Sequence, residues 1–174
     1  MWREAPLKDS YDIVLIGAGV HGLAIAYYLG KHGINNIAVL DKGYLGGGAS
    51  ARSTAILRAN YVTPEGIPLF HESLKLYDDL AQDLDYNLLF SKFGRIELAH
   101  TESSITALRI RAEFNAALGV DSRIIDPAQI SELVPVLNMR EDEDLPILAG
   151  LYHPPAGVIR HDAVIWAYGR AADR

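Results

Sequence analysis

The chain has 174 residues, and 49% of them are apolar, which is enough to bury one hydrophobic core of ordinary domain size. Its formal net charge is −6, and it has no basic cluster, which argues against partners such as nucleic acid or an anionic membrane surface. The lack of cysteine excludes disulfides and thiolate nucleophiles. Together with an acidic N-terminal segment that does not resemble a signal peptide, it favours a cytoplasmic location.

The first predicted elements form a βαβ unit over residues 11–41. An apolar strand at 11–16 leads into the glycine-rich sequence GAGVHG, then a helix from about 20 to 31, and a second strand at 37–40. Residues 13–30 are apolar over about the length of a membrane span, so a membrane anchor or signal peptide is the alternative. The four glycines, the histidine and the flanking charges in this stretch favour the strand and helix.

The glycine spacing in this unit is typical of dinucleotide binding. Gly17 permits the tight turn after the strand, Gly19 lets a diphosphate approach the backbone, and Gly22 lets the helix pack close to the sheet. Asp41, 19 residues after Gly22, is placed to accept a hydrogen bond from a ribose hydroxyl. The N–H groups and the dipole of the helix N-terminus favour phosphate binding. The alternative is an ordinary βαβ turn.

Residues 42–50 are too rich in glycine for a helix or a strand, and we expect a loop over 42–61. Glycines 46–48 (Gly48 among them) allow the backbone to approach a ligand, Ser50 and Thr54 offer hydroxyls, and Arg52 offers a planar set of donors for phosphate. A second contact surface on the dinucleotide favours FAD over NAD. The alternative is a flexible surface loop.

We predict an inserted region of helices and short strands over 62–153. A helix at 161–173, with Asp162 as its cap, then returns the chain to the flavin-binding part. Within this inserted region we expect helices at 64–85, 102–118 and 127–133, strands at 93–100 and 147–152, and an acidic surface loop at 139–145. A parallel sheet needs a strand after each crossover helix. The predicted fold is therefore α/β, a Rossmann-like FAD-binding βαβ in an incomplete flavin domain, with residues 1–174 the N-terminal part of a longer protein.

Three stretches resemble the glycine/D-amino-acid oxidase type of flavoprotein, and within it the β subunits of heterotetrameric sarcosine oxidases. They are Gly17–Leu29, Asp41–Tyr61 with the pattern LGGGxSxRxTxIxRxNY, and Gly157–Asp173. The resemblance implies a non-covalent FAD. The residues in the implied positions are Val20, His21, Asp41, Ala49, Ser50, Arg52, Thr54 and Ile56.

The resemblance also implies a second flavin, FMN, attached through its 8α position to a histidine, and His161 occupies the matching position. From the residues alone, the favoured alternative is that His161 only flanks the helix, next to an aspartate cap. Arg58 follows the FAD loop, and we expect it to face a flavin ring or the FMN phosphate. A structural salt bridge is the alternative for Arg58.

The implied activity is oxidation of the C–N bond of a secondary amino acid such as sarcosine, within a multi-subunit oxidase. In such enzymes FAD takes a hydride equivalent from the N-methyl group, and electrons pass to FMN and then to O₂. The alternatives are a related FAD enzyme of the proline or glycine type, or an inactive cofactor-binding fragment that serves as an interaction module. The sequence indicates no catalytic residue, and the spacing of His71, His100 and His153 does not suggest a metal site.

Overall fold

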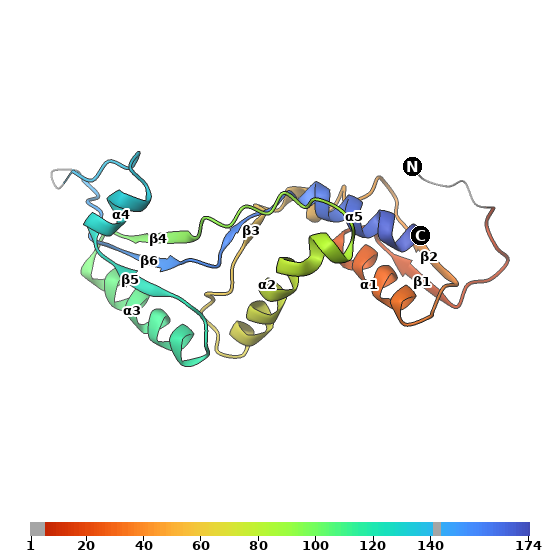
Figure 1. The fold of residues 1–174 in the computed structure, drawn as a ribbon, viewed down its shortest axis with the longest axis horizontal. Helices are drawn as coiled ribbons and strands as arrows, with labels where there is room; N and C mark the ends of the chain where they lie inside the picture. Colours follow the sequence, from red (N-terminus) through yellow and green to blue (C-terminus); the bar gives the residue numbers. More distant parts are fainter. Residues whose placement is uncertain (1–5, 141–143) are drawn as a thin grey trace. The chain divides into compact units, whose positions relative to one another are not determined.

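The computed structural model describes residues 6–140 and 144–174, and it divides into two compact units. The first unit comprises the described residues up to Ala55, together with Asp79–Phe90 and Ile159–Arg174. The second unit comprises Ile56–Asp78 and Ser91–Val158. Figure 1 labels helices α1 to α5 and strands β1 to β6. Part of the predicted acidic loop, residues 141–143, lies outside the described residues.

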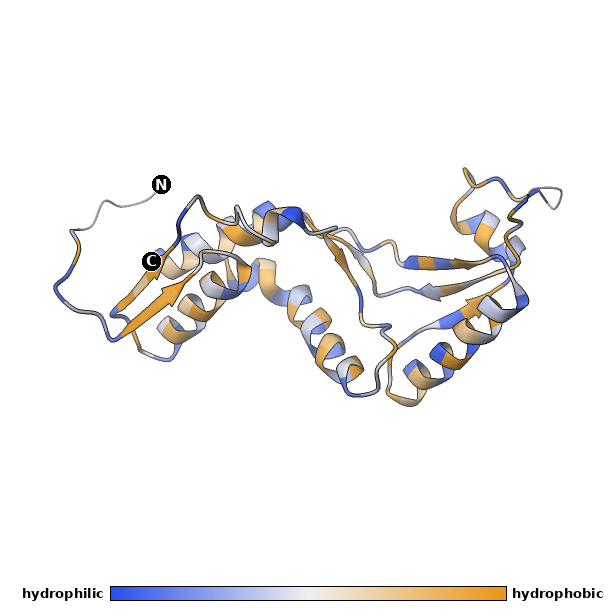
Figure 2. Cartoon of the chain, turned by 180° about the vertical axis from the view of Figure 1, so that it is seen from behind, coloured by the Kyte–Doolittle hydropathy of each residue, from blue (hydrophilic) through white to orange (hydrophobic). Residues whose placement is uncertain are grey.

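The first unit contains the predicted βαβ arrangement. Strands β1 (Ile13–Ile16) and β2 (Ile37–Leu40) pair in parallel, and α1 (Val20–Lys31) connects them. Figure 2 shows that both strands are hydrophobic along their length, as expected for strands of a parallel sheet. Helix α5 (His161–Asp173) packs alongside α1 (Figure 1). The α/β prediction for this part of the chain is confirmed.

The apolar stretch 13–30 is divided between β1, the glycine turn and α1. Among the described residues, no helix is both long and apolar enough to cross a membrane. Leu23 and Ala26 of α1 are buried. The hydrophobicity of this stretch therefore serves strand pairing and helix packing.

The second unit is built on an antiparallel sheet with the strand order β4–β6–β5. Helix α3 packs on this sheet and forms a core with it, made of Ala99, Ile105, Leu108, Ala149 and Leu151. The bounds of these elements are β4 (Arg95–Ala99), β5 (Arg123–Ile125), β6 (Ala149–His153) and α3 (Glu102–Ala117). The predictions of a strand near 93–100, a helix near 102–118 and a strand near 147–152 are confirmed.

Local capping explains where the helices of the second unit begin. The Thr101 hydroxyl accepts a hydrogen bond from the Ser104 N–H at the start of α3. At the start of α4 (Pro127–Leu133), Asp126 and Gln129 form the predicted capping box. Each reciprocal pair satisfies backbone donors that the first helical turn leaves free.

One predicted helix start and one predicted helix cap are wrong. Helix α2 (Gly66–Asp83) begins two residues after Pro64, because residues 64–65 form a turn closed by the Gly66 N–H on the Thr63 carbonyl. Helix α5 (His161–Asp173) has the predicted bounds, but its N-cap residue is Arg160. Asp162 is therefore not the cap; it lies in the first turn and forms an ion pair with Arg160 at 2.7 Å.

Several short elements were not predicted, because two or three residues are too few to show a hydrophobic period. The antiparallel pair β3 and β7 joins Ile56 to Val158 and Leu57 to Gly157. The bounds of these short elements are η1 (Ser50–Arg52), β3 (Ile56–Leu57) and β7 (Gly157–Val158), with β5 as the third short strand.

Candidate functional site

The turn between β1 and α1 depends on glycine, because side chains at some of its positions would collide with neighbouring atoms. Gly17 has a φ of 108°, in the region that favours glycine. A Cβ atom on Gly22 would overlap the Gly17 carbonyl oxygen, and one on Gly19 would lie 3.1 Å from the Ser50 hydroxyl. The turn is therefore a backbone cradle of the kind that fits the diphosphate of a dinucleotide.

Asp41 connects the end of β2 to this turn. Its Oδ2 accepts a hydrogen bond from the Ala18 N–H at 2.7 Å, and its Oδ1 accepts one from the Gly43 N–H at 2.8 Å. These backbone hydrogen bonds, the Ala18 one first, lower the pKa of Asp41. Asp41 thus orders the turn itself, a role that the sequence did not predict. Its contact with a ribose stays a prediction.

The loop after Asp41 lies against the glycine turn. The Gly46 N–H donates to the Ala18 carbonyl at 2.8 Å, and the Ser50 hydroxyl accepts from the Val20 N–H at 3.0 Å. A Cβ atom on Gly46 would overlap the side chain of Ile165 in α5. The loop is held by these contacts in a defined position, so the alternative of a flexible surface loop is not supported.

The other predicted FAD residues occupy different surroundings. His21, Gly48, Ala49 and Thr54 are exposed. Arg52 donates hydrogen bonds to the carbonyls of Gly47 and Gly48, so its guanidinium helps to shape the loop. Ile56 and Arg58 belong to the second unit, whereas the rest of the predicted FAD set belongs to the first. Their contacts with a flavin stay predictions.

His161 is the first residue of α5 and is partly exposed. Its neighbours Arg160 and Asp162 form a two-pronged ion pair, with Nε to Oδ1 at 3.0 Å and Nη2 to Oδ2 at 2.7 Å. Both members of the pair are thereby engaged with each other. The attachment of FMN to His161 stays a prediction.

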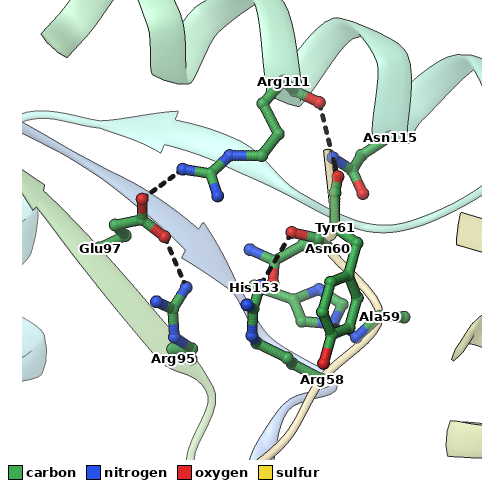
Figure 3. A network of polar contacts seen from close by, with 9 residues as sticks. All are labelled: Arg58, Ala59, Asn60, Tyr61, Arg95, Glu97, Arg111, Asn115 and His153. Carbon is green, nitrogen blue, oxygen red and sulfur yellow. Dashed lines mark hydrogen bonds and ion pairs between the residues drawn. The ribbon is translucent and has the colours of Figure 1, made fainter. Parts of the chain in front are cut away.

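Arg58 belongs to a polar network in the second unit (Figure 3). Its Nη1 donates to the Asn60 carbonyl at 3.2 Å, and its guanidinium lies over the Tyr61 ring, 4.1 Å from the centroid. Burial, and then the charge of Arg95, lower the pKa of Arg58. Among the described residues, no carboxylate lies within ion-pair distance of Arg58, so the alternative of a structural salt bridge is not observed.

The carboxylate in this network, that of Glu97, is already bonded to two other arginines. Glu97 accepts hydrogen bonds from Arg95 at 2.8 Å and from Arg111 (Figure 3). The Nδ2 group of Asn60, a residue with no exposed surface, has no hydrogen-bond partner in the described part of the chain. Among the described residues, the Arg58 guanidinium therefore lies without a carboxylate partner beside an unpaired buried amide donor of Asn60.

Sequence reasoning missed most of this network. Glu97, Arg111, Asn115 and His153 lie on different elements, and no motif or spacing links them. His153 was considered only as a metal ligand. Within residues 6–140 and 144–174, no three His, Asp or Glu side chains are grouped so that they could hold a metal ion.

Comparison with known proteins places the chain among flavoproteins. It is 44% identical to the sarcosine oxidase subunit beta of Arthrobacter sp. over 99% of this chain and 43% of that protein. It is 42% identical to the same subunit of Rhodobacter capsulatus over 98% of this chain and 41% of that protein. The chain thus spans less than half the length of these relatives.

A solved structure shows the same fold. The L-proline dehydrogenase of P. horikoshii superimposes with a TM-score of 0.86 at 23% identity, over 95% of this chain and 42% of that protein. The family model described as FAD dependent oxidoreductase matches residues 12–174. The chain therefore belongs to the FAD dependent oxidoreductase family.

Proposed function

We propose that the chain is part of a flavin-dependent oxidoreductase that oxidises a secondary amino acid such as sarcosine, as the β subunit of a multi-subunit oxidase. The structural observation that carries the proposal is the closure of the 43–50 loop on the glycine turn through Asp41, Gly46 and Ser50. The 44% identity to a sarcosine oxidase subunit beta supports the substrate class. The likeness to L-proline dehydrogenase supports only the fold.

The residues of the first unit would hold the FAD. The backbone cradle at Gly17, Gly19 and Gly22 would receive the diphosphate, and Asp41 would order the turn and accept from the ribose. Gly48 leaves open space where a side chain would stand, so the loop backbone can approach the ligand. When bound, the flavin supplies the two-electron oxidation of an amine to an imine.

In the second unit, Arg58 would bind an anionic group of a ligand. Its guanidinium is partly buried, has no carboxylate partner in the described part of the chain, and is oriented by Tyr61 and Asn60. The Asn60 Nδ2 group is a second donor that has no partner among the described residues. A carboxylate of the amino-acid substrate and a phosphate of FMN share this chemistry.

The test of the main proposal is the spectrum of the flavin in the flavin-loaded protein, without oxygen. Sarcosine should bleach the visible absorbance of the oxidised flavin within the time of one catalytic turnover. Bleaching by L-proline or glycine, and not by sarcosine, would favour the related FAD enzymes instead. A protein that binds no FAD would contradict the proposal and support the interaction-module alternative.

The attachment of FMN to His161 has a separate test. After acid precipitation of the protein, a covalent flavin stays in the pellet, and the His161→Ala variant should release it. The control is His100→Ala, because His100 lies in the second unit and its ring hydrogen-bonds the carbonyls of Leu145 and Pro146. Complete release of flavin from the unaltered protein would exclude the covalent link.

The partners and location extend the same proposal. The relatives in Arthrobacter and Rhodobacter are named as subunits, which supports a hetero-oligomer with other oxidase subunits. Co-purification of the tagged chain with further stoichiometric polypeptides would test the assembly, and purification alone at the mass of a monomer would contradict it. The cytoplasmic location stays a prediction, to be tested by cell fractionation.

A further inference from the structure

His153 is a buried histidine with both ring nitrogens engaged by backbone groups. It ends β6 and is only 1% exposed. Its Nε2 lies 3.1 Å from the backbone nitrogen of Ala59, and its Nδ1 is hydrogen-bonded to the Asp121 carbonyl. A backbone N–H can only donate and a carbonyl can only accept. The ring must therefore be neutral, with its proton on Nδ1 and its lone pair on Nε2.

The Ala59 N–H needs this acceptor, because β3 ends at Leu57. Ala59 and Asn60 are 1% and 0% exposed, so water cannot replace a lost partner without a change in structure. The Tyr61 N–H donates a hydrogen bond to the Ala59 carbonyl at 2.8 Å, and the Asn115 Nδ2 donates one to the Tyr61 carbonyl at 3.3 Å. Side chains from β6 and α3 thus hold a segment that has no strand partner.

This segment carries Arg58 and the unpaired Asn60 amide donor. Ala59 lies between Arg58 and Asn60, and Figure 3 shows the His153 ring beside all three. The guanidinium of Arg58 takes its direction from the Asn60 carbonyl and the Tyr61 ring. A rotation of the peptide at Ala59 would therefore turn both the guanidinium and the Asn60 amide.

We infer that His153, as the Nδ1–H tautomer, is a positioning residue: it sets the direction in which Arg58 and Asn60 present their donors to a carboxylate. The inference rests on the proposed role of Arg58 as an anion contact. His153 itself touches no ligand in this arrangement, because both of its nitrogens are occupied.

Two substitutions separate positioning from filling of space. In His153→Gln, the amide oxygen can accept from Ala59 and the amide nitrogen can donate to Asp121. In His153→Phe, the ring fills the site but makes neither hydrogen bond. The control is His100→Phe, which removes a histidine that bonds two carbonyls elsewhere in the same unit.

The probe is acetate, titrated into the flavin-loaded protein while the Asn60 side-chain amide signals are followed by NMR. We expect His153→Phe to weaken acetate binding about tenfold or more, His153→Gln to stay within about threefold of the unaltered protein, and His100→Phe to show no change. Hydrogen exchange at the Ala59 amide should accelerate only in His153→Phe. Unchanged acetate affinity, or a still protected Ala59 amide, in His153→Phe would overturn the inference.

The tautomer is tested in the unaltered protein, whatever the stability of the variants. Nitrogen-15 NMR of the His153 ring should show a protonated Nδ1 and an unprotonated Nε2, and the opposite tautomer would overturn the inference. If the unaltered protein shows no response of Asn60 to acetate while the tautomer is as expected, the anion-binding role of Arg58 fails instead. Sarcosine-dependent bleaching in the unaltered protein tests the proposed activity independently of both.

Discussion

The two units of the chain build their candidate sites from different materials. In the first unit, backbone groups make the cradle: the Gly17 N–H bonds the Leu40 carbonyl at 2.7 Å, and the Gly46 N–H bonds the Ala18 carbonyl. In the second unit, side chains from β4, β6 and α3 surround the segment that follows β3 (Figure 3). The first arrangement leaves a glycine pattern in the sequence, and the second leaves none.

This difference has a mechanical consequence. A contact between two backbone groups cannot be relieved by a change of rotamer, whereas a side chain can move aside at a modest cost. We therefore expect a glycine-to-alanine substitution in the turn of the first unit to be more destabilising than one in the sheet of the second unit.

The largest effect is expected for Gly22→Ala. The new Cβ atom would overlap the Gly17 carbonyl oxygen, so either α1 or the turn must shift. We expect the free energy of unfolding to fall by about 3 kcal/mol and FAD binding to be lost. Chemical denaturation and FAD titration measure the two effects. Gly30→Ala, in the same helix, meets only the Asn35 Oδ1 at 3.9 Å and should cost nothing; an equal loss in both variants would contradict the explanation.

A smaller effect is expected for Gly150→Ala in β6. Its Cβ atom would stand 2.8 Å from Ile96 Cγ2 and 3.1 Å from Ile130 Cδ1, which are side-chain atoms able to move. The free energy of unfolding should fall by about 1–2 kcal/mol, with FAD affinity retained. A loss as large as that of Gly22→Ala would remove the proposed distinction between backbone and side-chain contacts.

Acid should weaken the second unit through His153. Burial, the largest cause, lowers the pKa of His153 below its usual value of about 6.5. The unfolded chain then binds a proton that the folded chain does not. Stability is complete above about pH 6.5 and falls below it, by up to about 1.4 kcal/mol per pH unit, until the folded imidazole itself becomes protonated. Denaturation curves between pH 7 and 5 measure the slope, and His153→Gln should flatten it; an unchanged slope in that variant would assign the effect to other groups.

The smallest effect is expected for Ser50→Ala. The variant leaves the Val20 N–H without its acceptor at 3.0 Å, which should lower the free energy of unfolding by about 1 kcal/mol. Ser53→Ala is the control, because the Ser53 hydroxyl accepts from the Ala55 N–H two residues on, within the same loop. Thermal unfolding of both variants compares them. An equal shift would show that the bond between loop and turn contributes nothing beyond a local turn.

Local patterns predicted the parts of the fold that depend on near neighbours. The helical patterns of α1 and α3, the apolar run of β2, the Asp126 capping box and the glycine turn all arise within a few residues, so the sequence contains them. Asp162 was misassigned as a cap. An aspartate at a helix start can either cap the helix or pair with a neighbouring cation, and Asp162 forms the ion pair with Arg160.

The sequence by itself determined the βαβ unit, its glycine cradle and the presence of an acid at the tip of β2. Only the tertiary structure decided that Asp41 and Ser50 bond the turn, that Arg58 has no carboxylate partner among the described residues, and that His153 holds Ala59. The physical reason is range. Backbone conformation follows from residues a few positions apart, whereas the bond between His153 and Ala59 spans 94 positions and exists only after the sheet has formed.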